Sequence, residues 1–260
     1  MAQTDNHKPG AFSWIELSTT DQSAAKTFYI SLFGWTFTDF PMGPDDLYTM
    51  FALNGRTCAA VYTMRKDEQD MHIPPHWNLY ITVESADAAA KRAGELGGTI
   101  LAPPFDVSEH GRSAVIQDPA GAVFMLWQPK GNPGIGVQSE PGSFCWADLN
   151  TPDPKAAADF YSKLFGWELE PSKDGSGYLH IKNGSDYIGG IPPAEQQNPN
   201  APPHWMIYIQ VADCAASTAK AKDLGAKVYM GPMTMEKVGK ITVFADPQGA
   251  VSALFEQHRG

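Results

Sequence analysis

Two acidic residues occupy equivalent places in a repeated pattern and are the first candidates for chemistry. Glu16 follows Trp14 by two residues, and Asp148 follows Trp146 by two. Residues two apart in a β-strand point to the same face, so each carboxyl is expected beside an indole. An aromatic wall raises the pKa of a carboxyl and suits it to general acid–base catalysis, whereas the simpler interpretation is a hydrogen-bonding role. Glu16 and Asp148 are therefore candidate catalytic residues.

The sequence repeats itself, and the repeat predicts the elements that must position these residues. Three segments recur: KTFYISLFGW from Lys26 as ADFYSKLFGW from Ala158, PPHWNLYITV from Pro74 as PPHWMIYIQV from Pro202, and DPAGAV from Asp118 as DPQGAV from Asp246. Self-similarity of this kind indicates duplicated structural units. We predict two domains, residues 10–129 and 142–257, joined by a linker over residues 130–141, which is rich in glycine and proline.

Within each copy the pattern predicts a strand, a helix and three further strands, and then the same order again. Asp21 is placed to cap the first helix, and Gly34 to end it in a left-handed conformation. Pro154 and Gly166 bound the corresponding helix of the second copy. The expected fold is α+β, with each domain a pair of β-α-β-β-β modules that form one cupped antiparallel sheet. The DP-x-G segments are turn signals.

Strand alternation assigns side chains to the concave face of each sheet, which we call cup one in the first copy and cup two in the second. In the strand from His76, the alternate residues Trp77, Leu79 and Ile81 suit the helix side. The remaining positions predict ligand-binding residues, namely Trp14, His76, Asn78, Tyr80, Met125 and Trp127 in cup one and Trp146, His204, Met206, Tyr208 and Phe255 in cup two. A sheet face that mixes polar and aromatic groups favours a binding pocket, although core filling is the alternative for Trp14 and Trp146.

These motifs resemble the vicinal oxygen chelate superfamily, which includes glyoxalase I, extradiol dioxygenases and bleomycin-resistance proteins. The resemblance rests on the paired modules, FY-x-x-LFGW and DP-x-G, and it covers nearly the whole chain twice. More narrowly, the chain is similar to tandem-domain actinobacterial proteins described as hydroxylases or glyoxalase-like proteins, some of them associated with polyketide pathways.

The resemblance also implies metal-ligand positions, and this sequence departs from them. The ligand positions fall on Trp14, Asn78 and Met125 in the first copy and on Trp146, Met206 and Ala253 in the second, with no His, Asp or Glu in residues 57–64. Zinc and similar ions are bound by imidazole, carboxylate or thiolate groups. We therefore predict no metal and no other cofactor. A site offset onto the pair His76 and Glu16, or His204 and Asp148, would supply only two protein ligands.

Three functions stay open. The first is small-molecule binding in an aromatic-lined cup, in natural-product (polyketide-like) metabolism or resistance. The second is a tailoring enzyme of hydroxylase type that uses Glu16 or Asp148. The third is a metal-dependent glyoxalase- or dioxygenase-type enzyme with relocated ligands. Whether the chain is an enzyme is left open.

The composition of the chain limits the classes of partner and the cellular setting that we expect. The net charge of −10 argues against nucleic acid, which requires clustered Lys and Arg. No apolar run is long enough to span a membrane. Three widely spaced cysteines predict no disulfide framework and suit a reducing cytoplasm. Because one chain contains four modules, we expect a monomer formed by intramolecular domain pairing, with an aromatic small molecule as the ligand.

Overall fold

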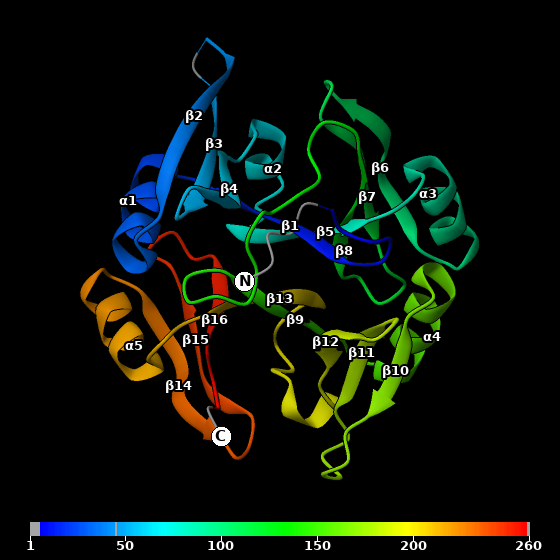
Figure 1. The fold of residues 1–260 in the computed structure, drawn as a ribbon. Helices are drawn as coiled ribbons and strands as arrows, with labels where there is room; N and C mark the ends of the chain where they lie inside the picture. Colours follow the sequence, from blue (N-terminus) through cyan, green and yellow to red (C-terminus); the bar gives the residue numbers. More distant parts are fainter. Residues whose placement is uncertain (1–5, 45, 259–260) are drawn as a thin grey trace.

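Each copy of the repeat forms one eight-stranded sheet with its long helices on the outside (Figure 1). The structure is a computed structural model that describes residues 6–44 and 46–258. The first copy contains β1 (Phe12–Thr19), α1 (Gln22–Phe33), β2 (Thr36–Gly43), β3 (Asp46–Leu53), β4 (Arg56–Thr63), α2 (Lys66–Asp70), β5 (His76–Thr82), α3 (Ala86–Glu95), β6 (Thr99–Val107), β7 (Gly111–Gln117) and β8 (Val123–Pro129). The second contains β9 (Phe144–Asn150), α4 (Pro154–Phe165), β10 (Glu168–Pro171), β11 (Leu179–Asn183), β12 (Asp186–Ile191), η1 (Ala194–Gln196), β13 (His204–Gln210), α5 (Cys214–Asp223), β14 (Lys227–Met235), β15 (Gly239–Ala245) and β16 (Val251–Gln257).

The two sheets have the same strand order, β2-β3-β4-β1-β5-β8-β7-β6 and β10-β11-β12-β9-β13-β16-β15-β14. This order confirms the predicted fold of two tandem domains, each built from paired modules. The sheets are mixed rather than wholly antiparallel, because β1 pairs with β4, and β5 with β8, in parallel. The two modules of the first domain meet where β1 runs antiparallel to β5. Glu16 therefore lies near the middle of its sheet, and Asp148 occupies the same place on β9.

The predicted boundaries of α1 are confirmed. The Asp21 side chain accepts a hydrogen bond from the Ala24 backbone N–H. Gly34 ends the helix with φ = 74°, a left-handed conformation that glycine adopts without strain, and its N–H donates to Ile30. No helix in residues 6–44 or 46–258 is long and apolar enough to cross a membrane.

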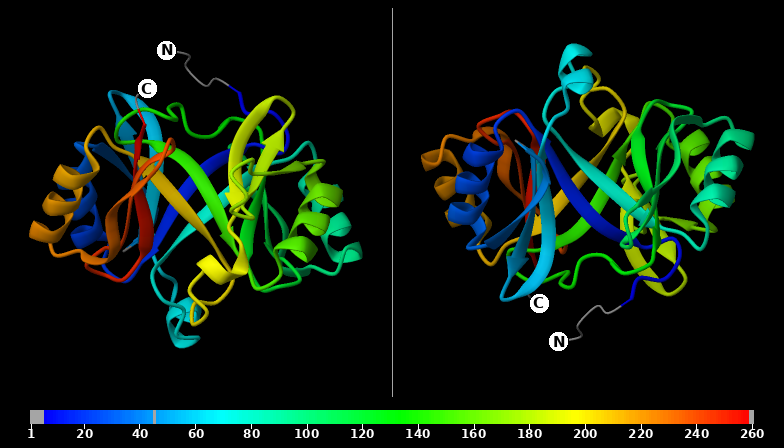
Figure 2. Two further views of the ribbon diagram at one scale, coloured as in Figure 1. Left: turned by 90° about the horizontal axis from the view of Figure 1, so that it is seen from below. Right: turned by 90° about the horizontal axis from the view of Figure 1, so that it is seen from above.

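The two domains pack as a pseudo-symmetric pair in which α1 lies beside α5 and α3 beside α4 (Figure 2). The Tyr29 hydroxyl donates to the Asp246 carboxylate at 2.9 Å, and the Tyr161 hydroxyl donates to the Asp118 carboxylate at 3.1 Å. Asp118 also accepts three backbone N–H bonds from its own turn. The FY motif of each copy thus contacts the DP-x-G turn of the other, which gives both motifs a structural role.

Candidate functional site

Glu16 is a buried carboxylate held between two tyrosines in cup one. It is 8% exposed. The Tyr48 hydroxyl donates to Oε2 at 2.5 Å, and the Tyr80 hydroxyl donates to Oε1 at 3.0 Å. The indole N–H of Trp14 donates to the Tyr48 oxygen at 3.2 Å. A buried carboxylate is costly unless it is hydrogen-bonded, so these donors make the arrangement stable.

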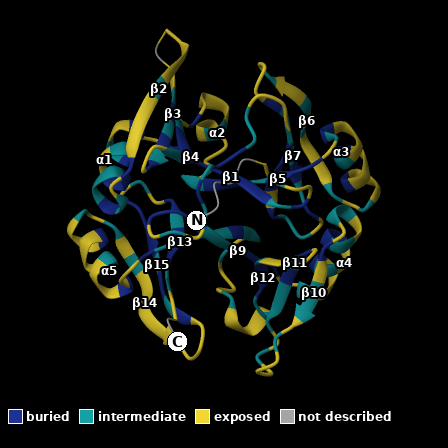
Figure 3. Cartoon of the chain, in the orientation of Figure 1, coloured by how far each residue is buried: buried dark blue, intermediate teal, exposed yellow. Residues whose placement is uncertain are grey.

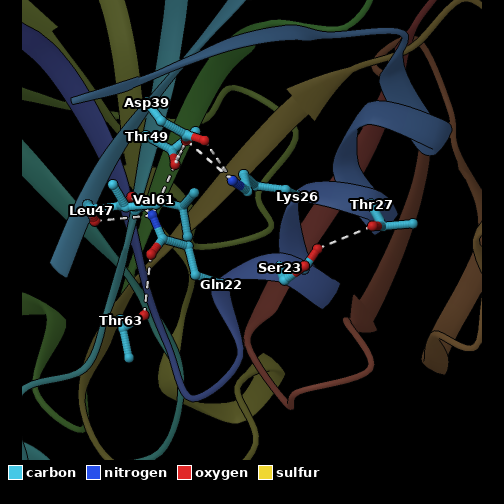
Figure 4. Close-up of polar contacts among 9 residues, drawn as sticks. All are labelled: Gln22, Ser23, Lys26, Thr27, Asp39, Leu47, Thr49, Val61 and Thr63. Atoms are coloured by element: carbon cyan, nitrogen blue, oxygen red, sulfur yellow. Dashed lines mark hydrogen bonds and ion pairs between the residues drawn. The ribbon is translucent and has the colours of Figure 1, made fainter. Parts of the chain in front are cut away.

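The Gln22 side chain of helix α1 contacts Leu47 and Thr49, the two sequence neighbours of Tyr48 (Figure 4). The Gln22 amide donates to the Leu47 carbonyl and the Thr49 hydroxyl at 3.1 and 2.9 Å, and also to the Val61 carbonyl at 3.1 Å. These bonds lie on the helix side of β3 and β4. Because successive side chains of a strand point to opposite faces, the bond to Thr49 directs its neighbour Tyr48 into the cup.

Asp148 repeats this arrangement in cup two. It is 7% exposed. The Tyr178 hydroxyl donates to Oδ1 at 2.6 Å, and the Tyr208 hydroxyl donates to Oδ2 at 2.7 Å. The Trp146 indole N–H lies 3.0 Å from Oδ1 and 2.9 Å from the Tyr178 oxygen. Each cup therefore holds one carboxylate, two tyrosines and one tryptophan in hydrogen-bond contact.

The two copies reach this geometry with different pairs of residues. Glu16 is in register with Ala60 on β4, whereas Asp148 is in register with Gly190 on β12. A β-carbon placed on Gly190 would lie 1.9 Å from the Tyr178 hydroxyl oxygen, so this ring rests directly on the glycine. Aspartate is one methylene shorter than glutamate, and glycine lets the tyrosine approach the sheet closely enough to meet it.

Burial is the main electrostatic influence on both carboxyl groups. It raises the pKa of Glu16, and hydrogen bonds from Tyr48, Tyr80 and Trp14 oppose that rise. Burial likewise raises the pKa of Asp148 against three such bonds. Burial is the larger cause and the nearby negative carboxylate the smaller cause that hold the pKa of each bonded tyrosine well above its ordinary value. The carboxyl groups are thus the most readily titrated members of each cluster.

Sequence reasoning missed Tyr48 and Tyr178, which supply the shortest hydrogen bond to each carboxylate. The sequence signal is weak: a tyrosine stands six residues before the Asn-Gly turn at Asn54 in one copy and five residues before the one at Asn183 in the other. Cup one has a further pair that sequence reasoning also missed. The Tyr62 hydroxyl donates to Glu68 of α2 at 3.2 Å.

The candidate histidines lie at the starts of their strands. His76 Nδ1 lies 2.9 Å from the Pro74 carbonyl, and His204 Nδ1 lies 2.8 Å from the Pro202 carbonyl. A carbonyl only accepts, so Nδ1 carries the proton in both rings. Burial lowers the pKa of His204. Among the described residues, neither imidazole is hydrogen-bonded to Glu16 or Asp148.

The other candidate residues are placed by their register partners and their contacts. Asn78 is in register with Glu16, and Met206 with Asp148. Met125 is in register with Tyr80. Trp127 packs edge-on against Tyr80, with ring centroids 6.2 Å apart, and donates its N–H to the Asn132 carbonyl at 3.0 Å. Phe255 is in register with Gln210 and is half-buried.

Comparison with known proteins decides the family. The family model described as Glyoxalase/Bleomycin resistance protein/Dioxygenase superfamily matches residues 11–126 and again residues 143–253. The chain belongs to this superfamily.

Relatives within it resemble the whole chain. CFP32 of Mycobacterium tuberculosis, which carries a provisional glyoxylase name, is 36% identical, and the match covers 98% of each chain. The anthracycline biosynthesis protein DnrV of Streptomyces peucetius is 34% identical over 97% of this chain and 95% of its own.

Two solved structures share the fold at low identity. The Mn(II)-bound glyoxalase of Novosphingobium aromaticivorans has a TM-score of 0.67 and 14% identity, covering 96% of this chain and 82% of that one. The 2,3-dioxygenase LapB of Pseudomonas sp. KL28 has a TM-score of 0.66 and 13% identity, covering 97% and 94%.

The side chains at the superfamily's metal-ligand positions do not fit a metal. These positions hold Trp14, Asn78 and Met125 in cup one, and Trp146 and Met206 in cup two. Indole lacks a lone pair for coordination, and amide and thioether groups are poor substitutes for imidazole and carboxylate. Among the described residues, no three His, Cys, Asp or Glu side chains are grouped so that they could hold an ion. No catalytic step through a metal is derived from these cups.

Proposed function

We propose that this protein binds a planar aromatic small molecule on its concave sheet faces, with a buried carboxyl group as the polar anchor. The observation that carries the proposal is the cluster formed around Glu16 and, again, around Asp148. In both cups a carboxylate accepts hydroxyl bonds from two tyrosines beside a tryptophan. Aromatic walls with a few convergent polar groups are the usual composition of a ligand site.

The walls suit a flat, fused-ring ligand. Offset or edge-on contacts between aromatic rings are worth about 0.5–1.5 kcal/mol per pair beyond burial of area. Two such contacts together with the hydrophobic term are enough for affinity of about 1 μM. Two relatives are named for anthracycline biosynthesis, and anthracyclines contain planar fused rings, which supports natural-product metabolism or resistance as the setting.

Titration with a planar probe tests this proposal. We expect 1,4-dihydroxyanthraquinone to quench tryptophan fluorescence with a dissociation constant of about 1–10 μM. The double variant Glu16→Gln/Asp148→Asn should weaken binding about tenfold, because it removes the negative charge of each anchor and replaces one of its two acceptor oxygens with an NH2 donor. Glu95→Gln is the matched control, since it neutralises an exposed carboxylate on α3. Absence of saturable quenching in the unmodified protein would contradict the proposal.

A second candidate is a tailoring enzyme in which Glu16 or Asp148 transfers a proton. The raised pKa of both carboxyl groups favours it, because a general acid or base works best when its pKa is near the working pH. Isotope exchange tests this function. The protein should catalyse deuterium incorporation next to the carbonyl of α-tetralone in heavy water, and Glu16→Gln/Asp148→Asn should not. Exchange at the buffer rate would argue for binding alone.

We also propose that the protein works as a monomer in a reducing cytoplasm. Tyr29 and Tyr161 bond the two domains to each other within one chain. The cysteines Cys58, Cys145 and Cys214 are all free. Free, largely buried cysteines suit a compartment that does not form disulfides.

A further inference from the structure

The two cups differ in how far solvent reaches their walls. In cup one, Trp14, Asn78 and Trp127 are 5%, 5% and 6% exposed. Their counterparts in cup two, Trp146, Met206 and Phe255, are all half-buried. An aromatic wall that already lies inside the protein offers a ligand little new contact area, whereas a half-buried wall offers much more.

The linker explains why cup one is covered. The Ile135 backbone N–H donates to the Ser13 carbonyl at the start of β1, and the next N–H, of Gly136, donates to Thr57 on β4. Ile135 is fully buried, and the Asn132 carbonyl accepts the indole N–H of Trp127. Residues 132–136 therefore close the end of cup one at which Trp14 and Trp127 lie.

Cup two also has a smaller side chain at one position of its floor. Tyr80 of cup one is in register with Met125, whereas Tyr208 of cup two is in register with Ala253. Alanine has three heavy atoms fewer than methionine, so a side chain that occupies the floor of cup one has no counterpart in cup two.

A separate cavity of about 650 Å³ lies at the end of β16. Its lining comes from both faces of the sheet, because Glu256, which accepts a hydrogen bond from the backbone N–H of Cys214 at the start of α5, lines it together with Gln257. Neither Asp148 nor Phe255 lines this cavity, so it is not part of cup two.

Exposed methionines form the rim of cup two on the edge strand β14, which is exposed along most of its length (Figure 3). Met230, Met233 and Met235 are 40%, 42% and 37% exposed. Met230 and Met233 pair with the residues of β15 that are in register with Ala253 and Phe255, so they belong to the same face. Methionine is flexible and polarizable and adapts to apolar ligands of irregular outline.

We propose that cup two, bounded by the methionine rim on β14, is the ligand site of this protein and that it takes an elongated planar aromatic molecule. One end of the ligand lies against Trp146 and Tyr208 above Asp148, and the other end extends past Phe255 toward the methionine rim. This assignment rests on the proposed binding function and locates it in one of the two cups.

Exchanging one residue between the cups tests the assignment. Ala253→Met places in cup two the side chain that cup one already accommodates at the same register position, and Met125→Ala makes the reverse change. The probe is 1,4-dihydroxyanthraquinone, followed by tryptophan quenching at fixed protein concentration. We expect one bound probe per chain, at least tenfold weaker binding to Ala253→Met, and a change of less than twofold for Met125→Ala. Far-ultraviolet circular dichroism and thermal melts show that each variant is folded.

The outcomes separate the assignment from the proposed function. Weakened binding in Met125→Ala with unchanged binding in Ala253→Met would place the ligand in cup one and overturn the assignment while leaving the function standing. Two bound probes per chain would also overturn it. If Ala253→Met does not fold, Met233→Ser on the exposed rim serves instead, and unchanged affinity in that variant would overturn the assignment to cup two. A protein that binds no probe refutes both.

Discussion

Gly190 is the position at which a single methyl group should break the Asp148 cluster. The added β-carbon of Gly190→Ala would lie 1.9 Å from the Tyr178 hydroxyl oxygen and 2.1 Å from the ring carbon that carries it. Ordinary contact begins near 3.4 Å, so Tyr178 must retreat by about 1.5 Å. That displacement breaks its 2.6 Å bond to Asp148 and the 2.9 Å bond that it accepts from Trp146.

The expected cost combines three effects. Overpacking costs about 1–3 kcal/mol, and loss of a hydrogen bond to a charged group costs about 1.5–3 kcal/mol. Replacing glycine by alanine offsets about 0.4–1 kcal/mol of this cost, because alanine lowers the conformational entropy of the unfolded chain. We therefore expect Gly190→Ala to lower the free energy of unfolding by about 2–5 kcal/mol. Gly43→Ala is the control, since among residues 6–44 and 46–258 its β-carbon meets only Asp46, at 3.8 Å, and it should change stability by less than about 0.5 kcal/mol.

Urea denaturation of four proteins measures the effect: the unmodified chain, Gly190→Ala, Tyr178→Ala and the double variant. With Tyr178 removed, the methyl group has room, so Gly190→Ala should cost almost nothing in that background. Asp148→Glu should partly rescue Gly190→Ala, because the pair then matches Glu16 and Ala60 of cup one. A cost below about 0.5 kcal/mol, or an equal cost with and without Tyr178, would refute the steric argument.

Four further predictions follow from the same contacts. Because burial raises the pKa of Glu16, the folded state binds this proton more tightly than the unfolded chain does. The free energy of unfolding of the native protein, relative to that of Glu16→Gln, should therefore rise as the pH falls from 8 and level off near the ordinary carboxyl pKa of about 4.3. Urea melts at several pH values measure this difference. Tyr161→Phe removes the hydroxyl that donates to Asp118 and accepts from the Trp205 indole, and it should lower the free energy of unfolding by about 1.5–3 kcal/mol in the same assay. A change near zero would contradict a stabilising role for this contact between the domains. Elemental analysis after dialysis should find no stoichiometric divalent metal, and one tightly held ion per domain would contradict this. Sedimentation at micromolar concentration should give a mass near 28.3 kDa, and a stable dimer would contradict intramolecular pairing.

The sequence was sufficient for the fold and for part of the site. The repeated FY and DP-x-G motifs predicted two copies, and alternation in the strand from His76 separated the helix side from the cup. Trp77, Leu79 and Ile81 are buried on the helix side as expected. These features are local, because they depend on spacing within one element or on a fixed offset between the copies.

Two features of the site depend on longer-range geometry and could not be predicted in this way. Tyr48 precedes Asn54 by six residues, whereas Tyr178 precedes Asn183 by five. The offset between the copies is 132 residues at the FY motif (Phe28 to Phe160), 130 between Tyr48 and Tyr178, and 128 at the PPHW motif (His76 to His204), so neither repeated motif aligns the two tyrosines. The covering of cup one depends on where the linker crosses β1 and β4, and Ile135 lies more than a hundred residues from its partner Ser13.

The proposed ligand-binding role accounts for the two carboxylate clusters in a way that stability alone does not. Placing a carboxylate inside a protein costs several kcal/mol, and replacing such polar clusters by apolar side chains is often neutral or stabilising. Both copies nevertheless keep the cluster, and each does so with its own steric match, Glu16 over Ala60 and Asp148 over Gly190. A face that only filled space would not require that match. What the two copies share is a carboxyl group of raised pKa aimed between two hydroxyls at the floor of an aromatic wall. In cup two the walls around that floor, Trp146, Met206 and Phe255, are half-buried, and it is there that we propose the ligand binds.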